Sequence, residues 1–208
     1  MSESLLNAFI LLFVVIDPIG VASLFCAITR GYSARAARAA AVRGVAVAFL
    51  LVLAFVLGGS LLLRYLGVSM PAFTVAGGIL LFLLAVDMVL VRQSGLRTAT
   101  ASEQEEAEHR TDISVFPLAI PMIAGPGTLT TVLLLTGDRG WSRQALEVML
   151  AVVLVLAITL AMLLAARLIQ RVLGETGVNV IVRVFGILLA ALAVQYVSNG
   201  IHQLATAP

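Results

Sequence analysis

Apolar residues gather into six stretches along the chain, and each is long enough to cross a membrane as a helix. The stretches cover about residues 5 to 28, 44 to 66, 71 to 91, 113 to 136, 145 to 166 and 181 to 202. Because about 20 helical residues span the hydrocarbon core of a bilayer, the pattern predicts an all-α membrane protein with six transmembrane helices.

Two hydrophilic segments lie between these stretches. The first follows the first span and is rich in alanine and arginine, so we expect an interfacial helix that begins after Gly31 and is capped by Ser33. The second, residues 92–112, contains four glutamates between positions 103 and 108, and we expect it to be a solvated cytoplasmic linker. The chain is therefore predicted to form a single transmembrane domain, 1–208, with a first repeat at about 5–91 and a second at about 113–202.

Arginines are distributed unequally between the two sides of the predicted membrane. The loops after spans one, three and five contain ten arginines, and the opposite loops contain three. Cytoplasmic loops carry the excess of positive charge, so we predict that both termini lie outside the cytoplasm. No basic residue precedes the first apolar stretch, and we expect this helix to be retained rather than cleaved as a signal peptide.

Composition excludes a soluble protein and gives no support for nucleic-acid binding. Hydrophobic residues make up 61% of the chain and charged residues 12%, against roughly 25% charged in soluble domains. The formal net charge is only +2, which is too small for an electrostatic footprint on nucleic acid. Cys26 is the single cysteine, and His109 and His202 lie far apart, so we expect no disulfide, no metal site and no cofactor.

The two halves of the chain show an internal repeat. An offset of 108 residues aligns 75–87 with 183–195, where seven of the thirteen positions are identical, and the same offset aligns Pro18 with Pro126. Because each half contributes three crossings, the second half must enter the membrane from the opposite face. The sequence therefore predicts two inverted three-helix repeats.

Both aligned prolines lie inside apolar stretches and are expected to break their helices. The first belongs to Asp17-Pro18-Ile19-Gly20 and the second to Gly125-Pro126-Gly127-Thr128. A single such proline would be interpreted as a packed kink. Broken helices at matching positions of two inverted halves are typical of a transporter binding site, so we predict broken first and fourth helices whose breaks meet near the midplane.

The residues at the breaks suit a small zwitterion. Amides at the start of a half-helix favour a carboxylate, and Gly20, Gly125 and Gly127 allow a ligand to approach the backbone. Asp17 could bind an ammonium group, or it could cap its own half-helix through amides near residues 19 and 20. Thr128 is expected to cap the second half of the fourth span.

Several residues outside the breaks are candidates for coupling or support. Asp87 lies near the cytoplasmic end of the third span and either extends to water or binds a proton or cation; its aligned residue is neutral Gln195. Arg183 is either a topology anchor or an interhelical partner. Gly78 and Gly186 would let helices approach closely, with a substrate-facing surface as the alternative.

Taken together, these motifs resemble the MarC family, also described as small neutral amino-acid transporters. The resemblance rests on four segments: Asp17-Pro18-Ile19-Gly20, Ala76-Gly77-Gly78 with Asp87-Met88, Ile120-Pro121 with Ala124-Gly125-Pro126-Gly127, and residues 186–200. It implies a six-helix inverted-repeat fold in the bacterial inner membrane and transport of glycine, alanine and similar amino acids. The segment Val21-Ala22-Ser23-Leu24-Phe25 departs from the family pattern, in which a polar residue and a proline are common, so the substrate stays open.

From the residues and the resemblance we expect a secondary transporter of small neutral amino acids that works by alternating access and is not an enzyme. Its expected partners are a small-molecule solute and membrane lipids, without nucleic acid. A coupling proton or sodium ion and a homo-oligomer are left open. The alternatives are an exporter of other small metabolites or amphiphiles, a non-transporting membrane scaffold, and an intramembrane hydrolase that uses Asp17 and Asp87 as paired carboxylates.

Overall fold

The computed structural model describes residues 3–91, 113–137 and 143–206, and every regular element in these parts is a helix. In chain order the helices are α1 (Glu3–Ile16), α2 (Pro18–Ile28), α3 (Ala34–Tyr65), α4 (Met70–Leu90), η1 (Ser114–Ile123), α6 (Pro126–Thr136), α7 (Arg143–Leu164) and α8 (Ala166–Thr206). Five of the described segments are long and apolar enough to cross a membrane, and the bent pair of η1 and α6 would be a sixth. The predicted all-α membrane protein is confirmed, while the predicted linker, 92–112, lies outside the described residues.

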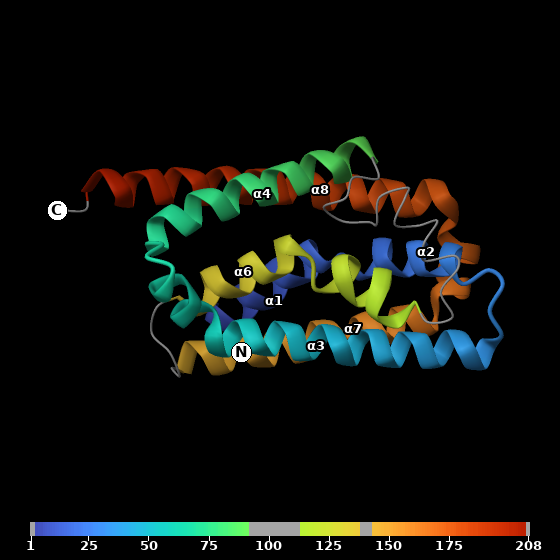
Figure 1. The fold of residues 1–208 in the computed structure, drawn as a ribbon. Helices are drawn as coiled ribbons and strands as arrows, with labels where there is room; N and C mark the ends of the chain where they lie inside the picture. Colours follow the sequence, from blue (N-terminus) through green and yellow to red (C-terminus); the bar gives the residue numbers. More distant parts are fainter. Residues whose placement is uncertain (1–2, 92–112, 138–142, 207–208) are drawn as a thin grey trace.

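The helices form three layers (Figure 1). α4 and α8 make one outer layer, α3 and α7 make the other, and α1, α2, η1 and α6 lie between them. In the first span, 61% of the most apolar segment is buried, against 22% in α3. The two spans that contain Pro18 and Pro126 therefore occupy the interior of the bundle.

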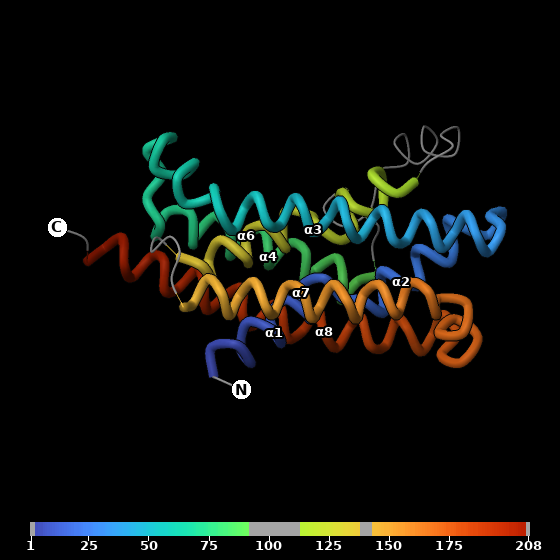
Figure 2. Tube along the Cα trace, turned by 90° about the horizontal axis from the view of Figure 1, so that it is seen from below, coloured from blue at the N-terminus to red at the C-terminus, as the bar shows by residue number. Residues whose placement is uncertain are grey.

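Each layer pairs one span from each half of the chain. α4 runs opposite to α8, α3 runs opposite to α7, and the segment α1–α2 runs opposite to η1–α6 (Figures 1 and 2). The connections α2–α3 and α7–α8 lie at one end of the bundle, and the connection α3–α4 and the start of α7 lie at the other. Every layer is thus an antiparallel pair.

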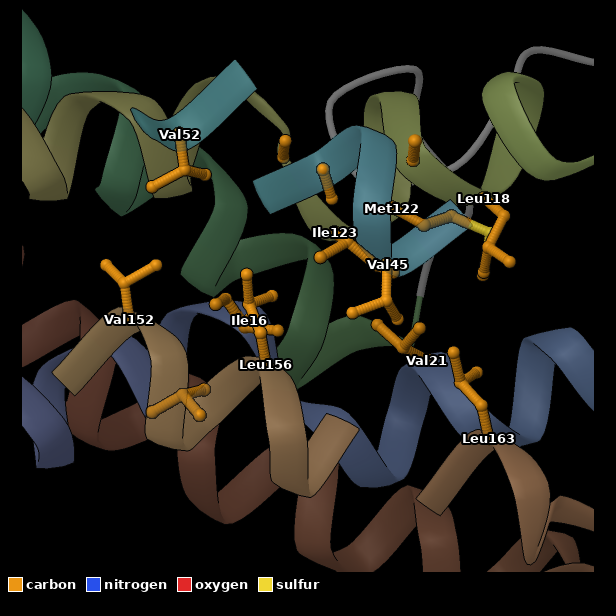
Figure 3. Close-up of a cluster of buried hydrophobic side chains, with 14 of the residues drawn as sticks. Ile16, Val21, Val45, Val52, Leu118, Met122, Ile123, Val152, Leu156 and Leu163 are labelled. Carbon is orange, nitrogen blue, oxygen red and sulfur yellow. The ribbon is translucent and has the colours of Figure 1, made fainter. Parts of the chain in front are cut away.

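Two clusters of buried apolar side chains join the layers. The larger cluster lies between the middle layer and the α3–α7 layer and includes Ile16, Val52 and Leu156 (Figure 3). The smaller cluster joins α1 to α4 and α8 and includes Val15 and Leu84. Since lipid tails are as apolar as leucine, close packing rather than escape from water stabilises these contacts within a membrane.

α3 is longer than the sequence predicts. The expected interfacial helix and the second span form one continuous helix, so the prediction of two separate elements is wrong. Ser33 does cap this helix, because its Oγ accepts a hydrogen bond from the Ala36 N–H at 3.2 Å. Alanine and arginine are strong helix formers and no proline follows before Tyr65, so nothing ends the helix at the membrane boundary.

α8 also begins before the predicted span at about residue 181. It starts at Ala166 and passes through Gly174, whose backbone is non-helical (φ 63°, ψ 179°). Glycine adopts a positive φ without the steric cost that a side chain would add. A short first section of α8 therefore precedes the long section that crosses beside α4.

Glycines let the main chains of α4 and α8 come into direct contact. A Cβ atom built on Gly78 would lie 2.9 Å from the Ala193 carbonyl oxygen and 3.0 Å from the Val197 amide nitrogen. A Cβ atom built on Gly186 would lie 3.0 Å from the Ala85 carbonyl oxygen. Helix packing, the first of the two roles predicted for Gly78 and Gly186, is confirmed.

Replacing Gly78 with alanine tests this packing. The added methyl group meets main-chain atoms of α8 that no side-chain rotation can move, so the helices must separate. We expect Gly78→Ala to lower the free energy of unfolding by about 1–3 kcal/mol, as overpacking does. The measurement is thermal or detergent-induced unfolding of the purified protein.

The matched control is Gly58→Ala in α3, where no heavy atom lies within 4 Å of the built Cβ. This change should leave stability unaltered or raise it by up to ~1 kcal/mol through helix propensity. Equal effects of the two substitutions would contradict the assignment of Gly78 to a tight interface.

Candidate functional site

The first break is centred on Asp17, which joins α1 to α2 in a left-handed conformation (φ 47°, ψ 71°). Aspartate adopts this conformation more readily than most residues, and Pro18 has no N–H with which to continue the ladder. The Asp17 Oδ1 atom accepts a hydrogen bond from the Gly20 N–H at 3.1 Å. Asp17 therefore caps α2, as one of its two predicted roles required, and the Gly20 amide is occupied by this carboxylate.

The helix is interrupted at Asp17 over about one residue only, which is less than the predicted broken helix implies. The Asp17 N–H donates to the Phe13 carbonyl at 3.0 Å, and the Val21 N–H donates to the Asp17 carbonyl at 3.0 Å. α1 and α2 together still form one membrane-spanning segment, Glu3–Ile28. The first helix is distorted at one residue rather than unwound, so the expected group of unsatisfied amides is not found at this break.

The second break is larger. η1 and α6 meet at an angle of 53°, and η1 is itself interrupted by non-helical Phe116 and Ile120, each followed by a proline across a cis peptide bond. The residue before a proline is disfavoured in the helical region, which accounts for both interruptions. α6 then begins at Pro126 without a side-chain hydrogen bond at its cap. The predicted break in the fourth span is confirmed.

The start of α6 leaves two amides outside the helical ladder. Pro126 has no N–H, and the Leu129 N–H is already bonded to the Gly125 carbonyl at 3.1 Å. The N–H groups of Gly127 and Thr128 lie between these residues in the first turn, where a helix offers no carbonyl acceptor. Such amides carry the partial positive charge of a helix N-terminus.

Thr128 does not cap α6, and that prediction is wrong. Its hydroxyl donates to the Ile123 carbonyl at 2.8 Å, so it satisfies an acceptor of η1 rather than an amide of α6. The chain turns through Ala124 and Gly125 between the two helices, which leaves the Ile123 carbonyl without a helical donor of its own. Thr128 therefore bridges the break.

Thr131, one turn further along α6, carries a buried hydroxyl without a hydrogen-bond partner in the described parts of the chain. Its side chain is fully buried. By contrast, the buried hydroxyls of Thr136 and Thr159 donate to the carbonyls four residues earlier, at 2.9 Å and 2.8 Å. A buried polar group without a partner is costly, so Thr131 marks a place where a donor or acceptor is missing.

The structure brings the second break against the first helix. A Cβ atom built on Gly127 would lie 3.4 Å from Val15 Cγ1 and 2.8 Å from Leu84 Cδ2. Val15 precedes Asp17 by two residues, so Gly127 lies beside the first break in the middle layer. The two breaks are therefore neighbours inside the bundle, while their predicted position near the midplane of the membrane stays a prediction.

Burial divides the predicted site residues. Pro126 is exposed, whereas the other six are buried: Asp17, Pro18, Gly20, Gly125, Gly127 and Thr128. The hollows found among the described residues are lined by other side chains. In this conformation six of the seven predicted site residues are therefore covered by neighbouring parts of the protein.

The residues proposed for coupling lie outside the breaks. Asp87 is half-buried in the last turn of α4, and Arg183 and Gln195 are exposed on α8. The Gln195 amide nitrogen donates to Asn199 Oδ1 at 2.8 Å on the same helix. Arg183 and Gln195 therefore add no buried group to the candidate site.

The polar groups at the breaks are backbone amides, hydroxyls and one carboxylate. Within the described residues, no group of three or more histidine, cysteine, aspartate or glutamate side chains is placed to hold a metal ion. Amides and hydroxyls bind a carboxylate well, and Asp17 supplies the opposite charge. The arrangement is chemically suited to a small organic zwitterion.

Sequence reasoning missed Thr131. The signal was present, because threonines occupy positions 128, 130 and 131 of an otherwise apolar stretch. A hydroxyl in a membrane span needs a partner, and its own helix supplies one only when the rotamer allows. The sequence could not show that the Thr131 hydroxyl, unlike those of Thr136 and Thr159, does not donate to a carbonyl of its own helix.

A family model described as "MarC family integral membrane protein" matches residues 2–205. Curated relatives match over nearly the full length. A UPF0056 membrane protein of Aquifex aeolicus is 35% identical, over 95% of this chain and 92% of the relative. The UPF0056 membrane protein YvbG of Bacillus subtilis is 34% identical, over 97% of this chain and 95% of the relative.

A third relative carries a location in its name. The UPF0056 inner membrane protein YhgN of Escherichia coli is 32% identical, over 96% of this chain and 97% of the relative. No solved structure matches the chain. The comparisons thus support a multi-pass membrane protein of known family.

Two substitutions of Asp17 separate its capping role from its charge. Asp17→Ala removes the acceptor for the Gly20 amide and places a side chain without local hydrogen bonds at positive φ, so we expect a loss of about 1–2 kcal/mol in stability. Asp17→Asn keeps an acceptor oxygen and tolerates the left-handed conformation, so its stability should stay near that of the parent. Thermal unfolding of the three purified proteins measures this, and an asparagine variant as unstable as the alanine variant would contradict the capping role.

Proposed function

The chain belongs to the MarC family of integral membrane proteins, and we propose that it is a secondary transporter of small neutral amino acids, not an enzyme, that works by alternating access. The observation that carries the proposal is the uncapped start of α6, which lies against α1 next to Asp17. A helix N-terminus within a membrane span needs a partner for its amides, and lipid provides none. A bound carboxylate would be such a partner.

The proposed substrate carboxylate binds at the start of α6. The amides of Gly127 and Thr128 are its first donors, since they lie outside the helical ladder. Thr131 follows Gly127 by four residues, so its side chain rises from the same face of α6, and its unpartnered hydroxyl is a third donor. Because Gly127 has no side chain, a small ligand could approach its backbone once α6 has moved away from Leu84 and Val15.

The proposed ammonium partner is Asp17. Its side chain is fully buried, and one of its oxygens is held by the Gly20 amide, so the carboxylate has a fixed position beside the middle of the bundle. Burial strengthens the attraction between this charge and a cationic amino group. A substrate that carries both charges would connect α2 with α6.

Substrate access requires a second conformation. Gly127 is now covered by Leu84 of α4 and Val15 of α1, so α6 must move relative to these helices before a ligand can reach its amides. A site that is buried between two halves of a transporter and opens alternately to either side has this property. The closed packing is therefore compatible with an occluded state.

We propose that the two halves form an inverted repeat related by a pseudo-twofold axis in the membrane plane. Support comes from the three antiparallel layers and from the α4–α8 contacts. Gly78 faces Ala193, and Gly186 faces Ala85; each of these residues is 108 positions from its counterpart. Each contact becomes the other when every residue is replaced by its counterpart 108 positions away. A twofold axis that relates the two halves would produce such a pair of contacts.

Transport is tested by uptake of labelled glycine and alanine into proteoliposomes. Thr131→Val removes a hydroxyl that has no hydrogen-bond partner among the described residues, so stability should be unchanged. Uptake should fall by about tenfold or more if that hydroxyl binds the substrate carboxylate. Thr159→Val is the matched control, because Thr159 is equally buried but donates to its own helix. Its uptake should stay near the parent level.

Parent protein that moves none of the small neutral amino acids would refute the proposed function. Equal uptake by the Thr131→Val variant and the parent would refute the proposed site while leaving the function standing.

We further propose that both termini face the periplasm, because the loops at the α2–α3 end carry most of the arginines. Fusions test this orientation. Alkaline phosphatase at the C-terminus should be active, and green fluorescent protein at the same place should be dark. The reverse pattern would overturn the orientation.

A further inference from the structure

The end of the bundle that carries the α2–α3 and α7–α8 connections lies on the right in Figure 2. Two hollows are lined by residues of these connections and of the helix ends beside them. Their volumes are about 440 Å³ and 420 Å³, within the range of about 300–1,000 Å³ that is usual for ligand sites. Arg167, in the first turn of α8, lines both hollows. The two hollows therefore adjoin at Arg167, and we consider them together as one candidate site.

The first hollow combines positive charge with an apolar wall. Arg35 and Arg38 from the start of α3 join Arg167 around it. Its apolar wall includes Phe25 from α2 and Leu164 from the end of α7. A ligand that fits this hollow has an anionic part and an apolar part.

The second hollow is more polar. It is lined by Arg30, Arg167 and Arg171 together with Gln170 and Cys26. The Gln170 carboxamide oxygen accepts a hydrogen bond from the Ser23 hydroxyl at 3.0 Å, which leaves the amide nitrogen as the group that can donate to a ligand. Every polar side chain of this wall other than the thiol thus offers donors suited to an anion.

A hydrogen bond to the protein backbone restricts the orientation of the Arg167 side chain. Its Nη2 atom donates to the Tyr32 carbonyl at 3.2 Å across the α2–α3 connection. A guanidinium group has further donors, and their fork geometry matches phosphate oxygens. The fixed orientation reduces the entropy that would be lost when an anion binds.

We propose that these hollows bind the phosphodiester headgroup of an anionic phospholipid. Five arginines surround them, and the described residues of the two walls include no acidic side chain. Basic pockets between transmembrane helices at one membrane surface bind such headgroups. The site is separate from the helix breaks, so it does not depend on the transport proposal.

A lipid fits better than free phosphate because apolar surface continues from the hollows. Leu164 is 48% exposed, and Leu168 and Val172 on the adjoining turns of α8 are 59% and 72% exposed. Side chains of this kind at the end of a membrane span lie where acyl chains begin. The headgroup would occupy the arginine-lined space while its chains follow these residues.

Native mass spectrometry of the full-length protein tests the proposal by counting bound lipids. Phosphatidylglycerol and cardiolipin are titrated separately, with phosphatidylcholine and inorganic phosphate as the other two arms. We expect saturable binding of one or two anionic lipids, and weaker binding of phosphatidylcholine and phosphate. Unsaturable uptake of anionic lipid, or equal retention of phosphatidylcholine, would overturn the proposal, and tight binding of inorganic phosphate alone would replace the lipid with a free anion.

Arginine variants locate the site. Arg167→Gln should weaken anionic-lipid binding by about tenfold or more, since a charge-assisted hydrogen bond is lost. Because Arg167 also donates a hydrogen bond to the Tyr32 carbonyl, Arg167→Gln could disturb folding as well as binding. The double variant Arg38→Gln/Arg171→Gln replaces two exposed arginines instead and should weaken lipid binding by a similar factor. Arg64→Gln, at the opposite end of α3, is the matched control and should bind lipid as the parent does; equal losses in all variants would show general attraction to charge instead of a site.

The lone thiol gives an independent measurement. Cys26 lines the second hollow and is partly exposed, so an occupied site should slow its reaction with N-ethylmaleimide. Anionic lipid in a nanodisc should protect the thiol in the parent and in Arg64→Gln, but not in Arg167→Gln. Protection that is the same in all three proteins would overturn the placement of the headgroup.

Discussion

Within a bilayer, every backbone group that leaves the helical ladder must find a partner in the protein, and this constraint organises the whole bundle. Pro18 and Pro126 interrupt the ladder in two spans, and both spans lie in the middle layer. The outer layers are formed by α3 with α7 and by α4 with α8, which contain no interior proline. The prolines that interrupt membrane spans are thus confined to the middle layer, where neighbouring helices can supply partners for the freed backbone groups.

The two breaks meet the constraint differently. Asp17 satisfies the first almost completely, because its side chain binds the Gly20 amide while helical bonds continue on both sides. At the second break, Thr128 satisfies the Ile123 carbonyl. The first-turn amides of α6, however, have no acceptor in their own helix, and the Thr131 hydroxyl has no hydrogen-bond partner among the described residues. The protein itself therefore satisfies the polar groups of the first break. At the second break, a ligand would supply the acceptor that the α6 amides and the Thr131 hydroxyl lack.

Much of this fold follows from the sequence, because spans of apolar residues and internal prolines are strong local signals. The error at α3 arose because the arginines near residue 35 indicate an interface, while alanine favours continuation of the helix through it. The capping by Asp17 was one of two predicted roles, which need not exclude each other, and the hydrogen bond from the Gly20 amide confirms the capping role. The sequence alone could not show the left-handed backbone that brings these two groups together. Thr131 was not predicted, since its significance depends on a rotamer and on burial by neighbouring helices.

The α4–α8 seam limits how the two halves could move during the proposed transport. At Gly78 and Gly186 the main chains of the two helices lie so close together that a side chain on either glycine would collide with the backbone of the other helix. Sliding one helix along the other would bring the residues beside each glycine against this backbone, whereas rotation about an axis through the seam would keep both contacts. The middle layer packs on this pair through Val15 of α1 and Leu84 of α4, and the same two side chains cover Gly127. The tight seam and the covered start of α6 are therefore joined through α4, and the opening that the proposed transport needs at Gly127 requires α6 to move relative to this helix.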